Sequence, residues 1–264
     1  MTLTSSASLS DLFVFPFRSK DWALKLLIGA AMSVLGALFL FIPALFVLGY
    51  LARLMRRIIG GGAPELPEWA DWGELFISGL KAGAAVLIYS IPALLFFGVG
   101  YAALLAPAMV PFFEQSSQAE ALAMLMLGGS FAGLWLMGAS MLVWLATAIL
   151  APVAITHLIA RDSFAAAFHV REWWRVLRAN LGGFLVAFIF MLGLMMLLYM
   201  VLNVIFLTII FCFLAPLVMA VLSVYQLLVG GALYADAYRE AVSRLAAAPV
   251  TLAEALPAAQ TAGE

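Results

Sequence analysis

The side chains of this sequence that are best suited to nucleophilic or metal chemistry are two histidines, His157 and His169, and one cysteine, Cys212. His157 lies near the end of an apolar run, His169 lies in a basic stretch, and Cys212 lies inside another apolar run. This spacing matches no metal-binding or nucleophile motif, and the three glycines at 60–62 lack the Lys-Ser/Thr pair of a phosphate-binding loop. We therefore expect a protein that is not an enzyme and that has no catalytic residue, cofactor or metal.

The chain is far too apolar for a soluble protein. It has 66% hydrophobic and 10% charged residues, whereas roughly 25% of residues are charged in soluble domains. The runs 82–109, 121–159 and 181–235 contain no Asp, Glu, Lys or Arg, so we expect an integral membrane protein. Ion-coupled transporters usually carry ionisable groups at membrane depth, and the absence of such groups from these runs makes a transporter less favoured.

The apolar runs set the number of membrane crossings, because one spanning helix needs roughly 20 residues. The runs 82–109 and 121–159 provide one crossing each, and the run 181–235 provides two, with a turn around 207–214 and Pro216 opening the final helix. The run 26–51 suits one crossing or two half-helices. The sequence thus predicts an all-α polytopic membrane helical bundle with four spanning helices plus a re-entrant hairpin, or five spans, and two amphipathic interfacial helices.

The 13 Lys and Arg residues border the apolar runs, and their distribution indicates the orientation of the chain. If the run 26–51 spans once, ten of them lie on one side and three on the other; if it forms a hairpin, all 13 share one side. The positive-inside rule favours the hairpin, for which Gly29, Gly36 and Pro43 are suitable break points. Either arrangement places the C-terminus in the cytoplasm, so we expect a multi-pass protein of the cytoplasmic (inner) membrane.

Three regions are expected along the chain. Residues 1–22 mix aromatic and basic side chains, which is typical of an N-terminal interfacial approach, and no basic segment precedes a short apolar core as in a cleaved signal peptide. Residues 23–244 form a single membrane domain. Residues 245–264 are rich in Ala and Pro and are expected to be a disordered tail.

The first of two polar islands covers residues 53–81. On a helical wheel Trp69 and Trp72 fall on one stripe, whereas Asp71 and Glu74 fall on the opposite side, as in a helix that lies in the membrane interface. We therefore expect Trp69 and Trp72 to be interfacial anchors. Because this surface helix is acidic, we also hypothesise that Asp71 or Glu74 pairs with arginines of the second island.

The second island covers residues 161–178 and repeats the pattern with a basic face. Arg171, Arg175 and Arg178 share one side of the expected helix, and Trp173 lies on the other. An arginine stripe of this kind suits anionic headgroups, and each basic residue near the membrane surface contributes about 1 kcal/mol. The three arginines are candidate lipid-headgroup contacts, and Trp173 is a candidate interfacial anchor.

Polar side chains inside the apolar runs are few, and Asn203 and Gln226 are the strongest candidates for a contact across the bundle core. Such groups more often form hydrogen bonds between helices than a substrate path. The small residues at 129–133 would let two helices approach closely.

One stretch also resembles a known family. The residues Gly49-Tyr50-Leu51-Ala52-Arg53, Arg56-Arg57, Leu66-Pro67-Glu68-Trp69-Ala70-Asp71-Trp72-Gly73-Glu74-Leu75-Phe76 and Gly79-Leu80-Lys81 carry the likeness. This signature is similar to that of an uncharacterised family of prokaryotic multi-pass membrane proteins known only as a domain of unknown function. The resemblance implies a membrane domain that covers most of the chain in bacteria or archaea, and it supplies no reaction, ligand or catalytic residue.

The leading functional hypothesis is a non-enzymatic scaffold or lipid-interacting protein. Its expected partners are membrane lipids, with a possible protein partner at the cytoplasmic face and no nucleic acid. The alternative is a permease or channel for an uncharged or lipid-like substrate, with a path past Asn203 and Gln226. A third hypothesis, an intramembrane enzyme, would require His157 to meet an acid such as Asp162 or Asp236 in a pocket.

Overall fold

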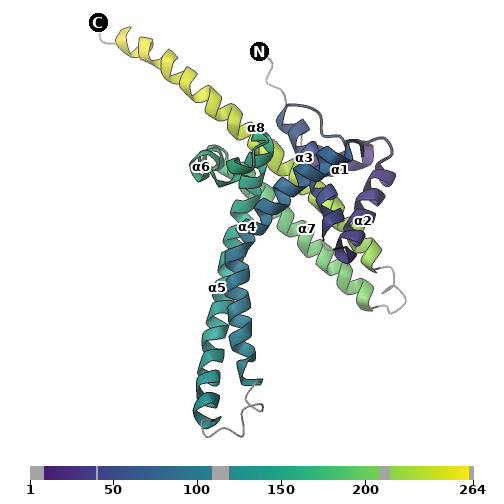
Figure 1. Ribbon diagram of the computed structural model, residues 1–264. Helices are drawn as coiled ribbons and strands as arrows, with labels where there is room; N and C mark the ends of the chain where they lie inside the picture. The colour runs from purple at the N-terminus through teal and green to yellow at the C-terminus, as the bar shows by residue number, and fades with distance from the viewer. Residues whose placement is uncertain (1–8, 40, 109–118, 208–214, 262–264) are drawn as a thin grey trace. The chain divides into compact units, whose positions relative to one another are not determined.

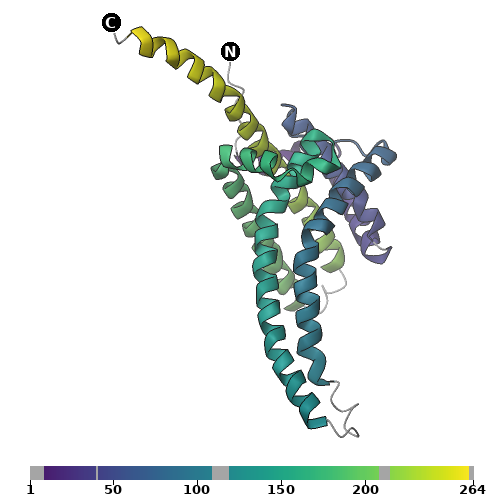
Figure 2. The same ribbon diagram turned by 60° about the vertical axis from the view of Figure 1, so that its left-hand side comes forward.

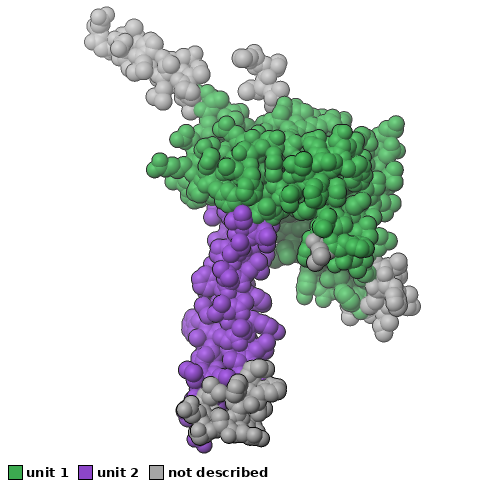
Figure 3. All heavy atoms as spheres, viewed as in Figure 1, with its two compact units in different colours: residues 1–85, 152–264 green, residues 86–151 purple. Residues whose placement is uncertain are grey.

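The computed structural model describes residues 9–39, 41–108, 119–207 and 215–261. Within these ranges the regular structure is helical, and no strand occurs. The chain divides into two compact units, residues 1–85 with 152–264 and residues 86–151 (Figure 3).

The first unit is built around the long helix α8 (Ala215–Thr261). Against α8 pack the helices α1 (Leu9–Arg18), α2 (Trp22–Leu38), α3 (Ile42–Ile59), α6 (Val170–Ala179) and α7 (Leu181–Leu207) (Figure 1). Two glycines of α8 allow close approach, because a Cβ at Gly230 would overlap Met191 of α7 and one at Gly231 would overlap Leu51 of α3. A short 3-10 helix, Phe164–Phe168, precedes α6.

The second unit is a pair of helical segments from α4 (Trp72–Leu105) and α5 (Ala119–Arg161), which lie side by side in Figures 1 and 2. The two segments meet at Gly100 and Gly133. A Cβ on Gly100 would lie 2.8 Å from the Gly133 carbonyl oxygen, and a Cβ on Gly133 would lie 2.6 Å from the Gly100 carbonyl oxygen. The Ser140 hydroxyl donates to the Ala93 carbonyl oxygen over 2.9 Å. Close approach is therefore found at Gly133, whereas Gly129 faces open space.

Four helical stretches are long and apolar enough to cross a membrane, which confirms the predicted all-α, multi-pass class. They are Trp72–Ala108, Ala123–Arg161, Leu181–Phe206 and Ala215–Ala247. A fifth crossing is possible if the bent pair Ser10–Arg18 and Trp22–Leu38, with 94° between its helices, forms one span.

The apolar run 26–51 is two helices rather than one. Helix α2 ends at Leu38 and α3 begins at Ile42, so the break lies between Gly36 and Pro43. A Cβ on Gly36 would lie 2.9 Å from the Ala44 Cβ, so the glycine lets the two helices approach where the chain turns. The two-helix interpretation is confirmed, and re-entry of this hairpin into a membrane stays a prediction.

The first predicted surface helix differs from the expectation. Helix α4 begins at Trp72 and continues without a break to Leu105, so the stretch 67–81 is not a separate helix, and Trp69 precedes it. The reason is that Asp71 has a left-handed φ of 54°, which interrupts the helix before Trp72, while no helix-breaking residue separates Lys81 from the apolar run.

At the other boundaries, the predicted turn at 207–214 falls almost entirely outside the described residues. Helix α8 begins at Ala215, so Pro216 stands in its first turn as expected. Residues 245–261, for which the sequence predicts a disordered tail, continue α8 in this structure. The region boundaries at 1–22, 23–244 and 245–264 stay predictions.

Candidate functional site

Helix α6 is short and strongly two-faced. Its sequence places Trp173, Val176 and Leu177 on one side, where all three are buried, and this side packs against α8. The Trp173 indole donates to the Ala167 carbonyl oxygen over 3.1 Å. Trp173, expected to be an interfacial anchor, is only 3% exposed, so this side chain packs α6 against the rest of the protein, and its role as an anchor stays a prediction.

Glu172 of α6 contacts side chains of α5. Its carboxylate lies 3.3 Å from His157 Nε2, 3.4 Å from His169 Nδ1 and 3.7 Å from an Arg161 guanidinium nitrogen. His157 is buried, and its Nδ1 lies 2.8 Å from the Tyr238 hydroxyl of α8. These contacts fix the rotation of α6 about its own axis, because they tie one edge of the helix to both α5 and α8.

His157 therefore meets one acid, Glu172, and Tyr238, whereas the two acids named as examples for an intramembrane enzyme, Asp162 and Asp236, pair with other residues. Asp162 instead lies 3.2 Å from the Lys81 amine, and Asp236 pairs with Arg239 over 2.5 Å. Within the described part of the chain, no three His, Cys, Asp or Glu side chains could together hold a metal ion. The expectations that the protein lacks catalytic activity, a cofactor and a metal stay predictions.

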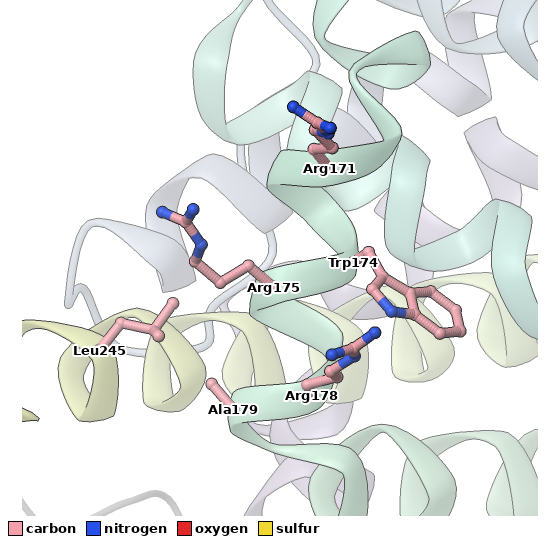
Figure 4. Close-up of a pocket in the computed structure, with 6 residues that line it drawn as sticks. All are labelled: Arg171, Trp174, Arg175, Arg178, Ala179 and Leu245. Carbon is pink, nitrogen blue, oxygen red and sulfur yellow. The ribbon is translucent and has the colours of Figure 1, made fainter.

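The three candidate arginines lie on the exposed side of α6. Together with Trp174, Ala179 and Leu245 of α8 they line an open hollow of about 580 Å³ (Figure 4). The Arg178 guanidinium carbon lies 5.4 Å from the centre of the Trp174 ring. The structure thus brings all three predicted residues to one surface and adds two apolar side chains, Trp174 and Leu245.

These arginines differ from most other basic residues in the protein. Nine of the 13 Lys and Arg residues form an ion pair with a carboxylate of the chain. Among the described residues, Arg171, Arg175 and Arg178 have no carboxylate partner, and the hollow that they line contains no acid. Among the Lys and Arg residues that the structure describes, Lys20 is the one other residue without a carboxylate partner. A concentration of unneutralised charge on one short helix is suited to binding anions.

Side chains of α2 and α3 form a clasp around the segment 62–71, which belongs to the first island and precedes α4. Tyr50 donates to the Pro67 carbonyl oxygen over 2.8 Å, and the buried Lys25 amine donates to the Leu66 carbonyl oxygen over 3.1 Å and to Glu68 over 2.7 Å. Arg53 donates to the Ala70 carbonyl oxygen over 2.8 Å. The side chains of α2 and α3 thus hold this segment mainly through its backbone.

Burial is the main cause that raises the pKa of the Tyr50 hydroxyl, and the negative charge of Glu68 raises it further. The hydroxyl therefore remains a hydrogen-bond donor at every physiological pH.

The two predicted tryptophan anchors belong to this clasp. Trp69 stacks on Tyr50 with 4.2 Å between ring centres, and its indole donates to the Lys25 carbonyl oxygen over 3.0 Å. Trp72 stacks on Trp69 at 5.8 Å and remains 43% exposed. Of the two, Trp72 is therefore the one whose side chain is free to meet an interface.

The hypothesis that the acids of the first island pair with arginines of the second is wrong. Glu74 lies 2.9 Å from Arg53 and 3.1 Å from Arg56, and Asp71 lies 3.7 Å from Arg53. The two islands do form ion pairs with each other, but the acid comes from the second island and the bases from the first. Asp162 of the second island pairs with Lys81 and Arg56 of the first. Helix α3 supplies arginines much closer to the start of α4 than the second island does.

The structure does not bring Asn203 and Gln226 into a contact across the bundle. Asn203 is exposed and donates to the Tyr199 carbonyl oxygen of its own helix over 2.8 Å. Gln226 lines a small apolar hollow of about 80 Å³ between α7 and α8. In the described apolar segments, hydrogen bonds between helices come instead from the hydroxyl groups of Ser130, Ser140, Thr147 and Tyr225, and close glycine packing adds to them.

Sequence reasoning missed Glu172, Trp174 and Leu245 as parts of the site. The spacing of Trp174 and Arg178, four residues apart on a helix, was a usable signal, since such pairs face each other. Leu245 gave none, because its place beside α6 depends on how α8 packs.

The long apolar helices define the chain as a multi-pass membrane protein. It belongs to the family described as "Protein of unknown function (DUF4013)", whose model matches residues 32–207 and so includes α6 and the part of the clasp formed by α3 and the segment 62–71, but not Lys25. The match does not single out the signature residues at 49–81 on which the resemblance rests. No curated protein and no solved structure matches the chain.

Proposed function

We propose that this protein is a non-enzymatic membrane scaffold whose α6 surface binds anionic lipid headgroups. The observation that carries the proposal is that Arg171, Arg175 and Arg178 are exposed on one helix and unneutralised, whereas nearly all other bases are paired within the chain. Ion pairs already made within the protein leave little charge for a ligand, so α6 is where headgroup binding would be strongest. A protein partner with an acidic surface would use the same face.

We also propose that the protein resides in the cytoplasmic membrane of a prokaryote, with both islands and the C-terminus in the cytoplasm. The support is that the links 109–120 and 207–214 contain no Lys or Arg, so the basic residues gather on the opposite side of the expected spans, all 13 of them if the run 26–51 is a hairpin and ten if it spans once. The inner leaflet of such a membrane carries the anionic lipids that α6 would bind.

The permease hypothesis has less support from the described residues. A path past Asn203 and Gln226 would need these side chains to face a common space, and Asn203 instead faces outward from α7. The scaffold proposal accounts for the charged surface without such a path.

The proposal is tested by the lipid selectivity of the purified protein in phosphatidylcholine bilayers. Spin-labelled phosphatidylglycerol and spin-labelled phosphatidylcholine report their relative association with the protein surface. We expect the wild type to prefer phosphatidylglycerol and the preference to fall in high salt. The variant R171Q/R175Q/R178Q should lower it about fivefold or more, because the loss of even one arginine contribution of about 1 kcal/mol corresponds to about fivefold.

A matched control removes the same charge elsewhere. R18Q/K20Q/R57Q takes three positive charges from exposed positions outside α6, including the other unpaired base. We expect it to keep most of the preference. An equal loss in both variants would assign the preference to net charge alone and contradict the proposal.

A further inference from the structure

The α6 surface presents its charges as two groups rather than as one. In Figure 4 the side chains of Arg171 and Arg175 extend to the same side of the helix, while Arg178 turns toward Trp174. The ring of Trp174 lies 5.4 Å from the Arg178 guanidinium carbon, so cation–π attraction favours this position. We therefore treat Arg171 with Arg175 as one candidate position for an anion and Arg178, beside Trp174, as a second.

The charge of the surface also exceeds what one ordinary anionic lipid supplies. A single phosphodiester carries one negative charge. Its oxygens can accept hydrogen bonds from two guanidinium groups that lie one helical turn apart. Such a headgroup would leave Arg178 without a counter-charge, because no described acid lines the hollow. A ligand with two phosphate groups on a short bridge would occupy both positions at once.

Building on the proposed function, we infer that the α6 site selects a lipid headgroup with two phosphodiesters joined by a short bridge, as in diphosphatidylglycerol. Binding two linked phosphates is favoured over binding two separate lipids, because the second contact then forms within one molecule at a high effective concentration.

The apolar part of the hollow favours a lipid over a soluble diphosphate. Trp174 and Leu245 line it together with the arginines, and Trp174 is exposed. An indole beside a basic group is typical of the level at which headgroups meet acyl chains. A small soluble anion would gain nothing from these two side chains.

The test compares diphosphatidylglycerol with phosphatidylglycerol at equal phosphate concentration, as competitors of a spin-labelled lipid on the full-length protein in phosphatidylcholine bilayers. We expect diphosphatidylglycerol to compete about fivefold better with the wild type, as one further arginine contact allows. R178Q should bring the two lipids to parity while both still compete better than phosphatidylcholine. R178K should keep part of the difference because it retains the charge.

Each remaining outcome has a distinct meaning. Parity of the two anionic lipids on the wild type would overturn the two-phosphate inference and leave the proposed function standing, whereas no preference for either over phosphatidylcholine would defeat both. Displacement by inorganic diphosphate as effective as by diphosphatidylglycerol would assign the site to a soluble ligand. The control R57Q should keep the fivefold difference, and its loss there would also overturn the inference.

Discussion

Lys25 is a cation held in the protein interior by one buried and one exposed partner. Its side chain is 6% exposed, its amine donates to the Leu66 carbonyl oxygen, and its ion-pair partner Glu68 is 77% exposed. Water already solvates Glu68, so the carboxylate loses little if the pair is broken. The Leu66 carbonyl, by contrast, would be left without its donor in the interior.

This asymmetry predicts unequal effects of removing the two partners. K25M should lower the free energy of unfolding by about 1–3 kcal/mol, because it leaves a buried acceptor unsatisfied. E68Q should lower the free energy of unfolding by less than about 1 kcal/mol. The amide oxygen still accepts a hydrogen bond from Lys25, and the carboxylate that is lost is largely exposed. Thermal unfolding of both variants in detergent measures the difference, and a larger loss for E68Q would contradict the described geometry.

The residue types near α6 could be predicted, but not all of their roles. The shared face of Arg171, Arg175 and Arg178 follows from helical spacing alone. The burial of Trp173 does not, because a tryptophan on the apolar face of a surface helix can meet either lipid or protein, and only the position of α8 decides. The partners of Asp71 and Glu74 likewise depend on where α3 crosses α4.

At the scale of the elements, the backbones of α3 and α4 approach each other closely where the two helices cross. A Cβ on Gly79 of α4 would overlap the Leu45 carbonyl oxygen of α3, and a Cβ on Gly49 of α3 would overlap the Leu75 carbonyl oxygen of α4. Both glycines belong to the signature stretch. Their lack of a side chain lets the arginines of α3 reach the acids at the start of α4.

Two alanine substitutions in α4 separate this packing from helix propensity. G79A should destabilise the protein by about 2–3 kcal/mol or more, because the added methyl meets backbone that cannot move aside. G73A has nothing within 4 Å of the new Cβ and should change stability by at most about 1 kcal/mol, toward greater stability. Thermal unfolding of the pair is the measurement; equal midpoints would exclude a close crossing at Gly79.

The helix breaks were only partly predictable from the sequence. Gly36 and Pro43 correctly bracket the break between α2 and α3, because both disfavour a continuous helix. Pro92 and Pro152 do not break α4 and α5, although proline alone would suggest it. The continuous helix from Trp72 was missed because a helical wheel describes faces and carries no information about whether a surface helix bends before it enters the next apolar run.

On the scale of the whole molecule, the sequence and the structure agree on a multi-pass chain with four long apolar helices, whereas a fifth crossing would lie in the run 26–51 by sequence and in the bent pair Ser10–Arg18 and Trp22–Leu38 by structure. The proposed orientation rests on the charge distribution, and the ion pairs of Lys81 and Arg56 with Asp162 agree with the proposal that both islands lie on one side of the membrane. The orientation itself is open to direct measurement.

Single cysteines placed in a C212S background test the proposed orientation with a membrane-impermeant maleimide. G61C and S163C lie at exposed positions of the two islands and should be labelled only in inverted membrane vesicles. S117C, in the link outside the described residues, should be labelled in intact cells, which makes it the positive control. Labelling of G61C or S163C in intact cells would reverse the orientation.

On the proposed function, the unpaired arginines of α6 hold anionic lipid in the native membrane. The most direct test is the ratio of anionic to neutral phospholipid that co-purifies with the protein from its native membrane in mild detergent, measured by mass spectrometry. We predict a ratio above that of the membrane for the wild type and for R18Q/K20Q/R57Q, and a ratio at least about threefold lower for R171Q/R175Q/R178Q. Equal ratios for the wild type and the α6 variant would contradict the account.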